Sequence, residues 1–130
     1  MIVDDDRALA RVMAAALRSQ GYVISVFSSA EDALDELVHE APDLLLLDIV
    51  LPGRDGWATL RELAERPEGT GMPVILISSN PVGRRQLEEG QPSAFLRKPF
   101  GMSDLLETVR NVFATTGRFN SAISPGFQAL

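Results

Sequence analysis

A short, strongly apolar run that ends in a carboxylate constrains this chain more than any other feature of its sequence. Four consecutive leucines at positions 44–47 stand between Asp43 and Asp48, and a Pro-Gly loop and an Asp-Gly step follow within residues 52–56. The run is too short to cross a membrane and too uniformly apolar for a strand with one solvent-exposed face. It therefore predicts a central strand of a parallel sheet that is covered on both faces. Asp48 would then lie at the carboxyl end of this strand, where open α/β sheets place their ligands.

Strands and helices alternate along the rest of the chain. Apolar and β-branched runs predict five strands, at residues 1–3, 22–27, 43–48, 73–78 and 94–96. Helical spacing of apolar residues predicts five helices, at about 7–19, 30–38, 57–64, 81–89 and 103–113. The expected helix caps are Asp6, the capping-box sequence at 28–31, Asp55, Asn80 followed by Pro81, and Ser103. The alternation predicts an α/β fold, a doubly wound five-stranded parallel sheet with helices on both faces, whose first strand is unusually short at its start.

Composition and charge exclude several classes of protein. The chain has 130 residues, a net charge of −6, no cysteine and a single histidine, His39. The negative charge argues against a nucleic-acid surface, and the missing cysteines exclude disulfides, thiolate chemistry and cysteine zinc sites. No apolar run approaches the roughly 18 residues of a membrane span, and no signal peptide is visible. We therefore expect one domain over residues 1–114, a flexible tail over 115–130, and a cytoplasmic protein that binds neither nucleic acid nor membrane.

Polar side chains follow four of the predicted strands. Asp4 and Asp5 follow the first strand, Asp48 ends the third, Ser78 ends the fourth and Lys98 follows the fifth. Because all strands of a parallel sheet end at the same edge, these side chains should converge. Three adjacent carboxylates repel one another, and Mg²⁺ would relieve that repulsion together with the lysine charge. The group suits phosphoryl transfer with Asp48 as the nucleophile, which would form an aspartyl phosphate.

The ordered motifs together resemble the receiver domain of two-component response regulators, of the chemotaxis-regulator type. They are the acidic pair after Ile2 and Val3, the string 48–56, Ser78 after the apolar run 74–77, and Lys98 followed by Pro99 and Phe100. The resemblance covers roughly residues 1–114. It implies a flavodoxin-like sheet with strand order 2-1-3-4-5, counted along the chain, and a cis peptide bond between Lys98 and Pro99.

The resemblance also implies roles for the polar residues. Asp48 would accept the phosphoryl group from a histidine kinase or a histidine phosphotransfer protein. Asp5, with Asp4 partly through water, would bind Mg²⁺ alongside Asp48 and the backbone carbonyl of Val50. Lys98 would pair with a phosphoryl oxygen. The domain would catalyse only its own phosphorylation and dephosphorylation, so it would not be an enzyme in the usual sense.

A switch between two packing states is implied as well. Ser78 would turn its hydroxyl toward the phosphate, and Phe95 would swing inward to fill the space left behind. The readout face would be the helix at 81–89, the strand at 94–96 and the helix at 103–113, which would bind an output partner that the sequence does not identify. The protein would act as a monomer or as a phosphorylation-dependent homodimer. Val50 has no polar side chain to orient an attacking water, so we expect slow self-dephosphorylation.

Three alternative functions remain open at this stage. A degenerate receiver could act as a binding module without phosphorylation. A phosphatase of the haloacid-dehalogenase type also forms an aspartyl phosphate, but it needs a second Asp two residues after the nucleophile, where this chain has Val50. A flavodoxin-like electron carrier needs a loop rich in hydroxyl groups and glycine after the first strand, where this chain has three aspartates.

Overall fold

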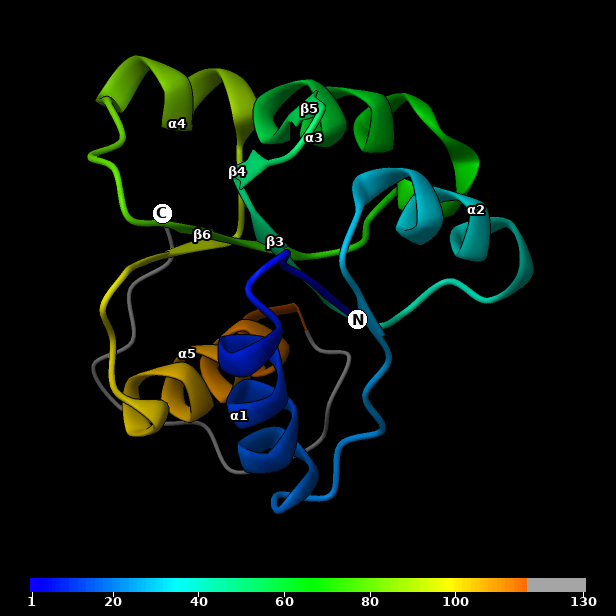
Figure 1. Cartoon of the computed structure of the whole chain (residues 1–130). Helices are drawn as coiled ribbons and strands as arrows, with labels where there is room; N and C mark the ends of the chain where they lie inside the picture. The colour runs from blue at the N-terminus through cyan, green and yellow to red at the C-terminus, as the bar shows by residue number, and fades with distance from the viewer. Residues whose placement is uncertain (117–130) are drawn as a thin grey trace.

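A parallel sheet with helices on both faces forms the core of the computed structural model, which describes residues 1–116 (Figure 1). The sheet has five strands in the order β2-β1-β3-β6-β7, all parallel to their neighbours. The strands are β1 Ile2–Val3, β2 Val26–Phe27, β3 Leu45–Asp48, β6 Val74–Ser78 and β7 Ala94–Arg97. The helices are α1 Arg7–Arg18, α2 Ala30–His39, α3 Gly56–Glu65, α4 Arg84–Gly90 and α5 Met102–Thr116, with a short 3₁₀ helix at Pro67–Gly69. The predicted fold class and strand order are thereby confirmed.

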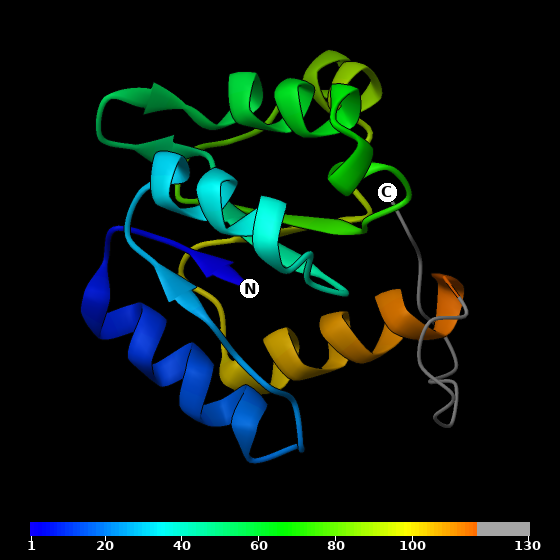
Figure 2. The same cartoon turned by 90° about the vertical axis from the view of Figure 1, so that its right-hand side faces the viewer.

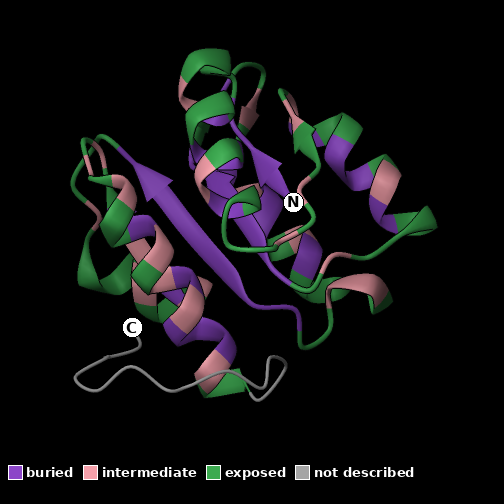
Figure 3. Ribbon diagram, turned by 90° about the horizontal axis from the view of Figure 1, so that it is seen from below, coloured by how far each residue is buried: buried purple, intermediate pink, exposed green. Residues whose placement is uncertain are grey.

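Side chains of the leucine run pack on both faces of the sheet. Leu45 and Leu47 belong to a buried cluster with residues of α2 and α3, whereas Leu44 and Leu46 belong to one with residues of α1 and α5. Alternate side chains of a strand point to opposite faces, so one run can serve two clusters. Figures 1 and 2 show α1 and α5 on one side of the sheet and α2, α3 and α4 on the other. Figure 3 shows the strands buried between these layers.

The loop after Asp48 is more ordered than the sequence suggested. Val50–Leu51 (β4) and Arg54–Asp55 (β5) pair as a small antiparallel hairpin, with Gly53 at its turn with φ +72°. The amide of Gly56 donates to the carbonyl of Ile49 at 2.8 Å, and a Cβ at Gly56 would overlap the Ile49 backbone. Only glycine allows this close approach. The hairpin is therefore closed at its base, directly beside the end of β3.

Several predicted elements are shorter than expected, among them the leucine strand, which begins at Leu45 rather than at residue 43. The strand predicted at 22–27 is reduced to Val26–Phe27, because β1 has only two residues and no strand residue lies opposite 22–24. The helix predicted from residue 81 begins at Arg84 instead. Asn80 does not cap it: its amide donates to the Ser78 hydroxyl at 3.0 Å, which places it in a turn at the end of β6.

The predicted caps were partly right. Asp6 accepts from the Leu9 amide at 3.0 Å and Asp55 from the Trp57 amide at 3.0 Å, as expected. The second helix is capped by Ser29 rather than by Ser28, and Ser103 lies inside α5, which begins at Met102.

The last described element is helix α5, which spans the point where the domain was expected to end. Helix α5 continues to Thr116, two residues past the predicted boundary at 114. The rest of the predicted tail lies outside the described residues, so the boundary and the tail stay predictions. No helix within residues 1–116 combines the length and apolarity needed to cross a membrane.

Candidate functional site

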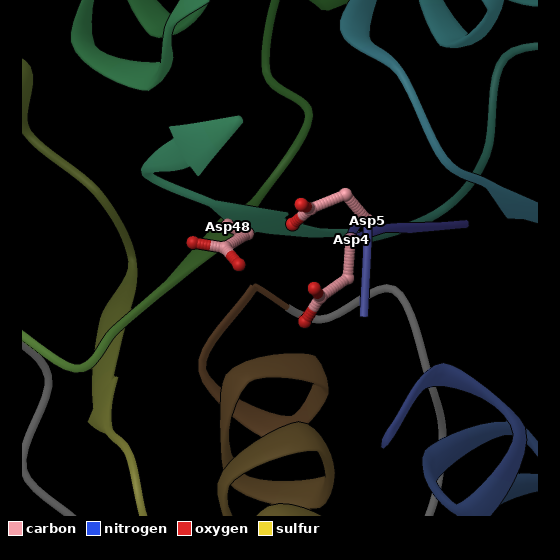
Figure 4. Close-up of side chains that lie close together, drawn as sticks. All are labelled: Asp4, Asp5 and Asp48. Carbon is pink, nitrogen blue, oxygen red and sulfur yellow. The ribbon is translucent and has the colours of Figure 1, made fainter. Parts of the chain in front are cut away.

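Three carboxylates meet at the carboxyl edge of the sheet (Figure 4). Asp4 and Asp5 directly follow β1, and Asp48 is the last residue of β3, the neighbouring strand. One carboxylate oxygen from each lies within 4.8 Å of the others. Asp4 and Asp48 are buried, at 1% and 4% exposed, whereas Asp5 is exposed to solvent. The predicted convergence of these residues is therefore present in the structure.

Lys98 provides the positive charge that faces the two buried carboxylates. Its Nζ donates a hydrogen bond to Asp48 Oδ2 at 2.9 Å and lies 3.1 Å from Asp4 Oδ2. Burial opposes the charge on Lys98, but the hydrogen bond to Asp48 and the negative charges of Asp4 and Asp48 outweigh it and raise the pKa of Lys98. Burial, together with the nearby charge of Asp48, raises the pKa of Asp4. The hydrogen bond from the Asp6 amide and the positive charge of Lys98 lower this pKa, but by less. The peptide bond after Lys98 is cis, as predicted.

The polar side chains at the strand ends share one local geometry. Asp4 Oδ1 accepts from the Asp6 amide at 2.9 Å, and Asp48 Oδ1 accepts from the Val50 amide at 2.9 Å. Ser78 Oγ accepts in the same way from the amide two residues on, that of Asn80. Asp and Ser side chains readily accept a hydrogen bond from the backbone amide two residues further on, which forms a turn. Short polar residues at the strand ends were therefore the sequence signal for these amide partners. Sequence reasoning found the side chains but missed the amides that orient them.

One carboxylate oxygen in the site is left without a hydrogen bond. Within residues 1–116, Asp4 Oδ2 is buried and has no hydrogen-bond partner, because the contact from Lys98 lacks hydrogen-bond geometry. Its one close contact is the ion pair with Lys98, and a buried carboxylate oxygen without a hydrogen bond normally takes an ion or an ordered water as a further partner. Mg²⁺ prefers oxygen ligands, and in proteins it is usually held by one or two carboxylates together with water and phosphate oxygens. The residues present therefore fit a hard divalent cation.

Ser78 and Phe95 occupy different surroundings. Ser78 is 1% exposed at the end of β6, next to β3, and its backbone carbonyl accepts from the Lys98 amide at 2.8 Å. Phe95 lies in β7, paired in register with Leu76, and its half-buried ring packs against the cluster that includes α2 and α3 residues. Val50 lies in the hairpin, and its side chain is 54% exposed. The roles expected for Ser78, Phe95 and the Val50 carbonyl stay predictions.

The sequence and the fold of this chain are similar to those of known receiver domains. A family model described as the response regulator receiver domain matches residues 1–110. A candidate response regulator from Chloroflexus aurantiacus is 30% identical, with a TM-score of 0.80 over 87% of this chain and 94% of that chain. A CheY-like receiver domain protein from Methanospirillum hungatei is 26% identical, with a TM-score of 0.80 over 90% and 94% of the two chains. The receiver domain of a histidine kinase from Syntrophus aciditrophicus is 26% identical, with a TM-score of 0.80 over 97% and 96%.

Proposed function

The chain belongs to the response regulator receiver domain family, and on that basis we propose that Asp48 is the residue that accepts its phosphoryl group. The family places the chain in two-component signalling, as a receiver rather than a classical enzyme. The donor would be a phosphohistidine of a histidine kinase or of a histidine phosphotransfer protein. The observation that carries the proposal is the Asp48 carboxylate, held by Lys98 on one oxygen and by the Val50 amide on the other.

The transfer itself needs little from the protein beyond positioning and charge. An Asp48 oxygen attacks the phosphorus of the donor, a new P–O bond forms, and the P–N bond to the histidine breaks. The bonding electrons leave with the imidazole nitrogen. Negative charge on the transferred group would be met by the Lys98 ammonium, which is already aimed at the acceptor.

The acidic cluster would hold Mg²⁺. Asp5 and Asp48 would be ligands, with Asp4 partly through water and with the carbonyl of Val50. When bound, Mg²⁺ would neutralise the carboxylates and polarise the phosphoryl oxygens. The buried Asp4 oxygen without a hydrogen bond and the exposure of Asp5 to solvent support this assignment.

The switch would begin at Ser78. To face a phosphoryl oxygen, its hydroxyl must reorient, which disturbs the bond that it accepts from the Asn80 amide. Asn80 lies in the segment that connects β6 to α4, so the disturbance reaches the start of α4 directly. Phe95 would respond from β7. The readout surface is thus α4, β7 and α5, for an output partner or for a second copy in a phosphorylation-dependent dimer.

Exposure to acetyl phosphate with Mg²⁺ tests the acceptor. We expect intact-mass spectrometry to show the mass gain of one phosphoryl group on the native chain and none on Asp48→Asn. The matched control is Asp35→Asn, an exposed carboxylate on α2, which should be phosphorylated normally. A fluoroberyllate complex that forms only with Mg²⁺, followed through the single tryptophan, would report the same site.

Two results would contradict the proposal. An adduct that persists in Asp48→Asn would move the acceptor elsewhere. No adduct on the native chain, with or without Mg²⁺, would leave the receiver as a phosphorylation-independent binding module.

A further inference from the structure

The hairpin of β4 and β5 sets the direction of two backbone groups beside Asp48. The Gly56 amide donates to the Ile49 carbonyl at 2.8 Å, so these two residues form a hydrogen-bonded pair at the base of the hairpin. Because pair types alternate in an antiparallel ladder, the next pair, Val50 and Asp55, exchanges no backbone bonds. The N–H and C=O of Val50 therefore point away from β5, on the same side. The N–H reaches Asp48 Oδ1 at 2.9 Å.

A hairpin with two residues in each strand needs anchors to keep its shape. Isolated two-stranded hairpins are marginally stable at best in water. The tip, Pro52 and Gly53, is exposed. Leu51 and Arg54 lie opposite each other, so their side chains share one face of the hairpin. Leu51 is 6% exposed and belongs to the cluster with residues of α2 and α3, so this face is turned toward the helices.

Arg54 connects this face to both helices. Its guanidinium donates to Glu62 of α3 at 2.8 Å, and its Nε lies 4.0 Å from Glu31 of α2. Arg66 lies 2.9 Å from the other oxygen of Glu62 and donates to the Leu34 carbonyl at 3.4 Å. The Arg54 and Glu62 side chains are 27% and 32% exposed, so solvent screens their contact less than that of a fully exposed pair. Within residues 1–116, no other charged side chain of the hairpin pairs with a helix.

We propose that Arg54 is a positioning residue for the phosphorylation site. Through Glu62 it holds the hairpin, so that the Val50 amide stays on Asp48 and the Val50 carbonyl stays beside the carboxylates. Arg54 acts through the hairpin rather than by contact with the acceptor, since its guanidinium is engaged with α3 and α2. This inference rests on the proposed function, because it takes Asp48 as the acceptor and Mg²⁺ as the cation.

A positioning role and a simple charge effect predict opposite signs. Arg54→Met removes a positive charge near a cation site, and this change alone would tighten Mg²⁺ binding. Loss of positioning loosens it instead, since outer contacts that orient metal ligands typically contribute tenfold or more to affinity. We expect the dissociation constant for Mg²⁺, titrated into the full ¹⁵N-labelled chain, to rise about tenfold in Arg54→Met. Arg54→Lys keeps the charge without the forked donors, and should lie between the two.

Two further measurements report the hairpin itself. In the chain without Mg²⁺, the Val50 amide should exchange its hydrogen several-fold faster in Arg54→Met than in the native chain. With acetyl phosphate, the Mg²⁺ concentration for half-maximal phosphorylation should rise, whereas the rate at saturating Mg²⁺ should stay near the native rate. Glu62→Leu should reproduce these changes. The double variant should be no weaker than either single one, because both substitutions break the same contact.

Matched controls separate positioning from a general loss of stability. Arg61→Met removes an exposed cation from the same helix, and should bind Mg²⁺ as the native chain does. Arg66→Met breaks the network on the side away from the hairpin. It should lower the urea midpoint of unfolding, but it should leave Mg²⁺ affinity and Val50 exchange unchanged.

Three outcomes would overturn the proposal. The first is an Arg54→Met chain that binds Mg²⁺ as tightly as the native chain or more tightly. The second is unchanged hydrogen exchange at Val50. The third is an Arg66→Met chain that loses as much Mg²⁺ affinity as Arg54→Met. A native chain that takes up neither Mg²⁺ nor a phosphoryl group would refute the proposed function instead, and the exchange measurement tests Arg54 separately because it needs no Mg²⁺.

Discussion

The buried amino terminus gives the 130-residue chain a predictable dependence of stability on pH. Burial lowers the pKa of the Met1 ammonium from 8.0 to about 6, and the negative charge of Asp43 only partly opposes this. The unfolded chain therefore binds this proton more tightly than the folded chain does. Stability should be unaffected by this group above about pH 8, and should fall as the pH drops from 8 to 6. A difference of about two pKa units corresponds to about 2–3 kcal/mol in the free energy of unfolding.

Acetylation of the amino terminus isolates this contribution. The acetylated nitrogen keeps an N–H that can donate to the Leu44 carbonyl, but it carries no charge. Met1 lines a pocket at the amino edge of the sheet, which has room for the acetyl group. We would measure urea unfolding of both forms from pH 5.5 to 9 through the fluorescence of the single tryptophan, Trp57. The acetylated chain should be more stable below pH 6, and the two forms should converge above pH 8.

The comparison between forms also removes other titrating groups from the result. His39 and all carboxylates are present in both, so their contributions cancel. Parallel stability profiles for the two forms would refute the reasoning. They would show that the amine is hydrated in the folded state rather than buried in the ladder.

Three further changes have expected outcomes. Gly90→Ala would place a Cβ 2.8 Å from the Trp57 ring. We therefore expect the free energy of unfolding in urea to fall by about 1 kcal/mol. A more stable variant would show that α4 can shift freely. Lys98→Met leaves the buried carboxylates of Asp4 and Asp48 without their cation, and should cost roughly 3 kcal/mol in urea unfolding in the absence of Mg²⁺. The same loss at saturating Mg²⁺ would argue against a cation in this cluster. Val50→Asn adds an amide at an exposed position beside the acceptor. The variant should shorten the lifetime of the phosphorylated chain several-fold, measured by the loss of the phosphoryl mass. An unchanged lifetime would show that this side chain does not control water attack.

The leucine run and the polar strand ends could be predicted because each depends on a local pattern and on one topological rule. An apolar run with a carboxylate at its end indicates a buried strand, and parallel strands end at one edge. What the sequence could not provide is the pairing within the site. The contact between Lys98 and Asp4 depends on how β1 and β7 lie across the sheet, and these strands are not neighbours.

The errors have a common physical cause. The segment 22–24 has strong β propensity, but a strand requires a partner, and β1 has no residue opposite this segment. Asn80 has the chemistry of a helix cap, but its amide bonds to Ser78 in a turn that ends β6.

The two buried clusters on opposite faces of the sheet have a consequence for how the protein can change over evolutionary time. They have no residue in common, but both include side chains of the leucine run that ends at Asp48. A volume change in either cluster can be compensated locally by residues on the same face. The run has no such freedom, since each of its positions must suit one cluster without displacing the strand from the other. We therefore expect the helices to drift in sequence while the strand that carries the acceptor changes least.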